Sequence, residues 1–147
     1  GMSEVMFAQM MIPHHKQAVS LSETAMNKSQ NPAILRLSRQ IKNAQNSEIS
    51  QMTYWLKATN SSMTMDHDMK MSGMLTVKEL ASLKSLTGTE FDRTFLALMI
   101  KHHQGALEMI DLISDSKNAE AKALSKAIDS AQRKEITSMK QLLKKLK

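Results

Sequence analysis

The sequence predicts an all-α protein, an up-down four-helix bundle built from two repeated helical hairpins. Three observations support this fold: apolar residues recur in heptad steps, one half of the chain repeats in the other, and no segment reads as a strand. At 147 residues the chain is long enough for one core and too short for two comfortable ones. We therefore expect a single domain, 1–147, with short loops joining antiparallel helices.

The first hairpin is expected over about residues 4–57. Its first helix, about 4–28, has an apolar seam that advances in steps of four and three residues: Phe7, Met11, His14, Ala18, Leu21 and Ala25. Asn31 followed by Pro32 is a typical helix start, because asparagine caps the first turn and proline suits its first position. The second helix is predicted from there to Leu56, and the short loop makes the pair antiparallel.

A connection over about residues 58–75 separates the two hairpins. After it, Thr76-x-x-Glu79 forms a capping box, which predicts one short extra helix that ends near Gly88. The second hairpin is expected over about 89–146. Its helices are predicted from about residue 90 to 114, with Thr89 as the cap, and from Asn118 or a neighbouring residue nearly to the C-terminus.

The two hairpins share a sequence motif. Phe7, Met11, Ile12, His14, His15 and Ala18 recur with the same spacing as Phe95, Met99, Ile100, His102, His103 and Ala106. The partner helices repeat as well: Ile41, Ala44, Gln45, Glu48, Ile49, Met52, Leu56 and Lys57 correspond to Ile128, Ala131, Gln132, Glu135, Ile136, Met139, Leu143 and Lys144. Each hairpin therefore carries a His-His pair and a glutamate at helical spacing.

Composition restricts the classes of function. The net charge of +6 comes largely from lysines near the C-terminus, where the helix dipole favours cations, and with few aromatics we expect no nucleic-acid partner. No apolar run is long enough for a membrane span, and we expect any secretion signal to have preceded Gly1. There are 14 methionines and no cysteine, a composition that suits an oxidising compartment.

The heptad phase places His14, His102, Glu48 and Glu135 toward the bundle interior. A buried carboxylate is costly unless it is paired or binds a metal, so we expect the glutamates to pair with these two histidines. Adjacent histidines do not share a helix face, so His15 and His103 are expected at a neighbouring interface. Two interpretations stay open: satisfied buried polar contacts that fix helix register, or a transition-metal site that could take Zn, Cu, Fe or Ni.

Other chemistry in the bundle has less support. Di-iron bundles use about four carboxylates and two Glu-x-x-His motifs, and neither set is present. Nucleophilic catalysis has neither a cysteine nor a Gly-x-Ser-x-Gly motif. A phosphotransfer bundle needs a surface histidine, whereas the seam buries His14 and His102.

The connection holds a second chemical signal, Met63-x-Met65-x-His67-x-Met69-x-Met71. Spacing of two places the side chains on one side of an extended segment, and it fits no helical core pattern. Thioethers are soft neutral ligands that select Cu(I) and, by extension, Ag(I), while imidazole suits copper in either oxidation state. We interpret the segment as a soft-metal site; the alternative is a linker or a strand that covers the bundle.

These motifs resemble those of the domain of unknown function family 305. The resemblance rests on the doubled Met-Ile-x-His-His motif and on Gln45, Glu48, Ile49, Met52, Trp55 and Leu56. It implies a ferritin-like four-helix bundle, usually secreted or periplasmic in bacteria, with some members that bind copper and help resist it. Carried over by motif, the metal positions are Met11, His14, His15, Met99, His102 and His103, with Glu48 and Glu135 nearby. At the start of the first repeat, Ser3 stands where the second repeat has Phe91.

We therefore predict a non-enzymatic, extracytoplasmic protein that sequesters or buffers copper, with silver as a second ion that it would bind. Cu(I) is the favoured ion, with Cu(II), Ag(I) or Zn as alternatives. Two other functions stay open: a metal-dependent oxidoreductase that uses the inner His and Glu residues, and a purely structural helical module. The sequence identifies no metal-delivery partner and no oligomeric state.

Overall fold

A computed structural model describes residues 2–63 and 71–146, with the side chains of residues 2 and 3 excepted. Its regular elements are α1 (Met2–Lys28), α2 (Pro32–Ala58), α3 (Val77–Ser85), α4 (Gly88–Met109), the 3-10 helix η1 (Ile110–Ile113) and α5 (Ala119–Lys145). Within this part of the chain every regular element is a helix, which confirms the predicted all-α class. In that range, no helix is both long and apolar enough to cross a membrane.

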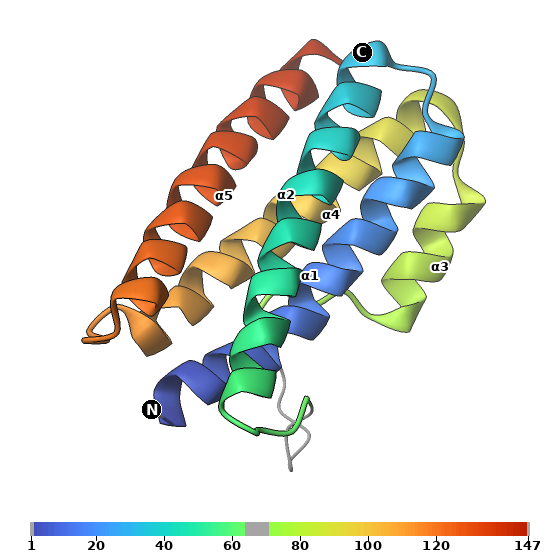
Figure 1. Ribbon diagram of the computed structural model, residues 1–147. Helices are drawn as coiled ribbons and strands as arrows, with labels where there is room; N and C mark the ends of the chain where they lie inside the picture. Colours follow the sequence, from blue (N-terminus) through green and yellow to red (C-terminus); the bar gives the residue numbers. More distant parts are fainter. Residues whose placement is uncertain (1, 64–70, 147) are drawn as a thin grey trace.

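The four long helices pack into a bundle (Figure 1). Helices α1 and α2 form one hairpin and α4 and α5 the other, and the hairpins meet through contacts of α1 with α4 and of α2 with α5. Neighbouring long helices run in opposite directions, so α2 and α4 run the same way, and α4 begins at the opposite end of the bundle from the end of α2. The short helix α3 lies in that connection and packs against α4.

Most helix starts follow the capping signals in the sequence. The Asn31 side chain accepts a hydrogen bond from the amide of Ala33, and Asn118 accepts one from Ala121. Thr76 and Glu79 form a complete capping box at α3. The third long helix differs from the prediction, because it begins at Gly88, after Thr87, with no side-chain cap.

Two further differences concern helix geometry. The predicted third helix to residue 114 is α-helical only to Met109 and continues as the 3-10 helix η1. In α1, Pro13 lies inside the helix, where it removes a backbone hydrogen bond and its ring crowds the preceding turn. The first turns of α1 bend away from the direction of the rest (Figure 1), as expected next to a helical proline.

The core consists of two apolar clusters at opposite ends of the bundle. The first, at the end with the start of α1 and the end of α2, includes Phe7, Met11, Met52 and Ile128; Ile113 also belongs to it. The second cluster packs Leu21, Ile34, Ile41, Phe95, Met99 and Met139, among others. Between the clusters each long helix carries buried polar residues: His14, His15, Gln45, His102, His103, Gln132 and Glu135. A polar layer therefore crosses the middle of the core.

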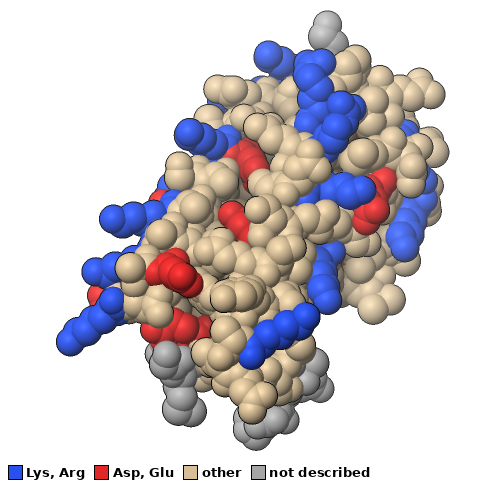
Figure 2. All heavy atoms as spheres, in the orientation of Figure 1, with Lys and Arg blue, Asp and Glu red and all other residues tan. Residues whose placement is uncertain are grey.

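Charge is distributed unevenly on the surface. Figure 2 shows lysine and arginine side chains over the upper part of the face and along the outer edge of the bundle, with fewer carboxylates between them. The exposed cations Arg36 and Arg39 lie near the start of α2, and Lys140, Lys144 and Lys145 near the end of α5. The last two lie in the final turn of α5, where the negative end of the helix dipole favours them.

Candidate metal centre

All four repeat histidines are buried in the polar layer. His14, His15 and His103 are fully buried and His102 is 1% exposed. They come from α1 and α4, which lie side by side and bring His14 and His102 into contact. Burying a polar ring is unfavourable unless its nitrogens form hydrogen bonds or bind a metal. The contacts of each ring therefore show which nitrogens remain for a metal ion.

The glutamates pair with the second histidine of each motif. His15 Nε2 donates to Glu48 Oε1 at 2.7 Å across the α1–α2 interface, and His103 Nε2 donates to Glu135 Oε1 at 2.6 Å across α4–α5. The expected pairing of the glutamates with His14 and His102 is therefore wrong. Each long helix contacts two others, so adjacent histidines about 100° apart on a helix face two different interfaces. The expected placement of His15 and His103 at a neighbouring interface is confirmed.

The first histidines of the two motifs meet each other. The rings of His14 and His102 have centroids 3.8 Å apart and an interplanar angle of 30°. His14 Nε2 also donates to the backbone carbonyl of Ser72, at 3.0 Å. Within the polar layer, the two hairpins therefore meet at an imidazole pair.

Several buried nitrogen and oxygen atoms in this layer have no hydrogen-bond partner among the described residues. They are Nδ1 of His14, His15 and His103, Nε2 of His102, and the amide oxygens of Gln45 and Gln132. When the ring hydrogen of a neutral imidazole lies on Nε2, as the bonds to Ser72, Glu48 and Glu135 require, Nδ1 carries a lone pair. Buried lone pairs without a partner are uncommon in native cores, and a metal ion would use them.

Burial keeps the central pair neutral. Desolvation lowers the pKa of His14 to about 4, against the hydrogen bond to Ser72, which raises it. The pKa of His102 is lowered well below its ordinary value, again by desolvation first and then by the repulsion of His14. Neutral imidazole is the form that binds metals, so both rings are available as ligands at neutral pH.

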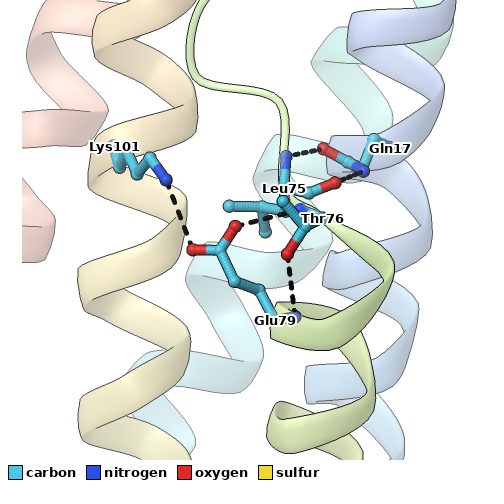
Figure 3. Close-up of polar contacts among 5 residues, drawn as sticks. All are labelled: Gln17, Leu75, Thr76, Glu79 and Lys101. Atoms are coloured by element: carbon cyan, nitrogen blue, oxygen red, sulfur yellow. Dashed lines mark hydrogen bonds and ion pairs between the residues drawn. The ribbon is translucent and has the colours of Figure 1, made fainter.

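The end of the connection crosses the bundle directly beside this pair. The Gln17 side chain donates to the carbonyl of Leu75 and accepts from its amide, at 3.1 and 2.9 Å (Figure 3). Lys101 of α4 pairs with Glu79 of α3 at 3.3 Å on the other side. We call residues 71–76 the strap, since it is fixed to α1 and, through α3, to α4.

A glycine of α4 makes room for the strap. A Cβ atom built on Gly105 would lie 2.0 Å from the Ser72 carbonyl oxygen and 2.8 Å from the Cα of Gly73. Gly73 itself has a φ of +76°, a conformation that favours glycine. In the sequence repeat, Gly105 and Gln17 occupy equivalent positions. The same position therefore binds the strap on one helix and accommodates its backbone on the other.

The remaining predicted ligands are placed less uniformly. Met11 and Met99 are fully buried, one in each apolar cluster. Met63 is 39% exposed, and Met71 is half-buried against the first cluster. Met65, His67 and Met69 lie outside the described residues, and within the described ranges no group of three or more His, Asp or Glu side chains is arranged to share one ion. The sequence analysis did not identify Ser72, Gln17 and Gly105, which hold the strap beside the imidazole pair. The signal that could have indicated them is the difference between glutamine at position 17 and glycine at the equivalent position 105.

The comparisons with known proteins identify the family. The family described as "Domain of unknown function (DUF305)" matches residues 4–143. The chain belongs to the DUF305 family. Among curated proteins none matches it.

Solved structures of DUF305 proteins share the fold along nearly the whole chain. A DUF305 fragment from Deinococcus radiodurans is 33% identical with a TM-score of 0.91, covering 98% of this chain and 97% of its own. A putative secreted DUF305 protein from Streptomyces coelicolor is 27% identical with a TM-score of 0.93, covering 97% and 93%.

CopM has also been solved with metals. CopM in its Cu(I)-bound form is 29% identical to this chain with a TM-score of 0.81, covering 97% of this chain and 96% of its own. It has been solved in Ag-bound and Cu(II)-bound forms too. The family and the helical bundle are therefore established, and a structural relative binds the soft metals that the sequence favours.

Proposed function

We propose that this DUF305 protein binds monovalent copper, and silver as its analogue, in the polar layer of the bundle, and that it sequesters or buffers copper outside the cytoplasm without catalysing a reaction. The observation that carries the proposal is the set of buried, unpartnered imidazole nitrogens on His14, His15, His102 and His103. The Cu(I), Cu(II) and Ag forms of CopM support the choice of metal. The bundle would have the ferritin-like topology, with the Met-rich connection as its crossover.

The contacts of the layer suit a soft monovalent ion. The rings of His14 and His102 lie in contact and each has an imidazole nitrogen without a hydrogen-bond partner among the described residues. Met11 and Met99 lie about one turn before them on the same helices. The carboxylates of Glu48 and Glu135 hold the outer nitrogens of His15 and His103, an arrangement that orients metal-binding imidazoles in many proteins. These carboxylates would also offset the positive charge of a buried ion.

The alternative, a purely structural layer, makes a different prediction for metal uptake. Under anaerobic conditions, the protein is titrated against a chromogenic Cu(I) chelator, and the wild type is compared with the double variant His14→Leu/His102→Leu. Leucine fills similar volume without a donor. We expect the variant to lose high-affinity Cu(I) while it keeps its helical circular dichroism. A wild type that takes no Cu(I) from the chelator would refute the proposal.

A second pair of variants separates the bundle from the connection. Met63, Met65, Met69 and Met71 are replaced together by leucine, and Ser22→Ala serves as a buried control away from the layer. If the connection contributes a separate soft-metal site, the Cu(I) stoichiometry falls while the affinity of the bundle site stays. An unchanged stoichiometry would remove the connection from the proposal and leave the bundle site in place. Addition of copper should not start oxygen consumption, which a metal-dependent oxidase would show.

A further inference from the structure

One face of α1 carries two methionines between its first turn and the histidine that it contributes to the imidazole pair. Met6, Met10 and His14 are spaced four residues apart, so their side chains lie on one helix face, about one turn from each other. Their exposure falls along the series, from 37% at Met6 to 7% at Met10 and 0% at His14. Exposure along this face therefore decreases from the surface toward the residue that contacts His102.

The ends of the connection are fixed along this face. The side chain of Gln9 donates to the carbonyl of Ser62 at 2.9 Å, and Met63, the next residue, is 39% exposed. At the inner end, the Ser72 carbonyl accepts from His14, and the preceding Met71 packs on the same apolar cluster that contains Met10. Met63 and Met71 are thus each next in sequence to a residue whose backbone carbonyl accepts a hydrogen bond from α1.

The internal repeat argues against a role as simple core filler. The positions equivalent to Met6 and Met10 in the second repeat are Thr94 and Leu98. Both are half-buried, so an aliphatic or polar side chain serves this place on α4. At these two positions thioethers occur only in the first repeat, on the helix whose Gln9 and His14 side chains bind residues at the two ends of the connection. Since methionine and leucine are close in volume, the sulfur atom is the property that differs.

We propose that Met6 and Met10 form a capture site for Cu(I) or Ag(I) and pass the ion to His14. This inference rests on the proposed function of the polar layer and adds the path by which the ion reaches it. Each step exchanges one neutral ligand for another on a monovalent ion, so no electron is transferred. Thioethers carry no proton to displace near neutral pH, and a two-sulfur site one turn from the pair would hold the ion more weakly than the imidazoles that receive it.

The first test uses methyl NMR with the layer disabled. In the His14→Leu/His102→Leu variant with ¹³C-methyl methionine, Ag(I) is added as silver nitrate in chloride-free buffer. We expect the methyl signals of Met6 and Met10 to shift together and saturate at about one equivalent. The signal of Met26, a half-buried methionine farther along α1, is the internal control. Signals of Met6 and Met10 that move no more than that of Met26 would overturn the inference.

The second test measures loading of the intact layer. Transfer of Cu(I) from a chromogenic chelator is followed in time for the wild type, for Met6→Leu/Met10→Leu and for the control Met26→Leu. We expect the double variant to load about tenfold more slowly, with the equilibrium affinity almost unchanged, and the control to load at the wild-type rate. Loading of the double variant at the wild-type rate would refute the capture site while leaving the proposed function intact. No Cu(I) binding by the wild type would refute both.

Discussion

Gly105→Ala tests whether the strap is packed on α4 beside the imidazole pair. On helix propensity alone, alanine inside α4 should stabilise the protein by about 1 kcal/mol relative to glycine. The structure predicts the opposite sign. The new Cβ would lie 2.0 Å from the Ser72 carbonyl oxygen and 2.5 Å from its carbon, so the strap backbone would have to move by about 1 Å or more to restore contact distances.

The displacement breaks the bonds that the strap makes to α1. The strap accepts one hydrogen bond from His14 and exchanges two with Gln17, each worth about 1 kcal/mol. Their loss exceeds the gain in propensity, so we expect Gly105→Ala to lower the free energy of unfolding by about 2 kcal/mol. Urea unfolding would show it as a midpoint about 1 M lower, at the slope typical of small proteins.

Two control variants make the result interpretable. Gln104→Ala, at the neighbouring exposed position of α4, measures the small effect of propensity alone. Gly73→Ala places a Cβ 2.7 Å from the Lys101 carbonyl and 3.0 Å from the Cα of Gly105, so it should open the same contact. The two glycine variants should therefore be strongly non-additive. A Gly105→Ala protein more stable than the wild type would show that the strap does not lie against α4.

Three further outcomes follow from the structure. Burial lowers the pKa of His14 to about 4 and lowers that of His102 as well, so below pH 6.5 the unfolded chain binds more protons than the folded one. The free energy of unfolding should therefore be highest above pH 6.5 and fall toward pH 4, with about 3 kcal/mol of the loss due to His14 and a further loss due to His102. Urea midpoints that stay constant from pH 7 to 4.5 would contradict this. Glu48→Gln and Glu135→Gln should each weaken Cu(I) binding, measured by chelator competition, by about tenfold or more while the helix content is retained. Wild-type affinity in both variants would show that the carboxylates have no role in Cu(I) binding. Thr76→Ala removes the capping box of α3 and should cost about 1 kcal/mol in urea unfolding, and an unchanged midpoint would count against that cap.

The helices and their caps were predictable because the signals are local. Asn31, Thr76 and Asn118 cap the helices where the sequence indicates, and heptad spacing buries His14 and His102 as expected. Such signals depend on residues within one or two helical turns, and each hairpin has its own cap and heptad pattern. The start of α4 was placed two residues late because Thr87 precedes the helix without a side-chain bond that would mark it.

The partners of the glutamates were not predictable from the heptad phase. A seam assigns one inward direction to each helix, whereas in this bundle α1 faces both α2 and α4. His14 faces α4 and meets His102, and His15 faces α2 and meets Glu48. The strap was missed for a related reason. Its contacts join positions far apart in the sequence, and a carbonyl such as that of Ser72 leaves no trace in side-chain periodicity.

The hydrogen bonds within the polar layer do not by themselves account for its presence in the core, because apolar residues could stabilise the fold equally well. Replacing both partners of a buried hydrogen bond by apolar groups of similar shape is often nearly neutral or stabilising, while removal of one partner costs about 1–3 kcal/mol, and more when the partner left behind is charged. We therefore expect His15→Leu/Glu48→Leu to be at least as stable as the wild type without metal, and His15→Leu alone to be clearly less stable.

If the layer binds a metal ion, adding the ion should make the wild type more stable than the apolar double variant. A ligand that binds only the folded state stabilises it by about 2.7 kcal/mol at one hundred times its dissociation constant. With Ag(I) present, the melting temperature of the wild type should rise and that of the apolar double variant should not. If instead the double variant is strongly destabilised without metal and both proteins respond equally to Ag(I), the His15–Glu48 pair serves helix packing, and the unpartnered nitrogens of the layer need another explanation.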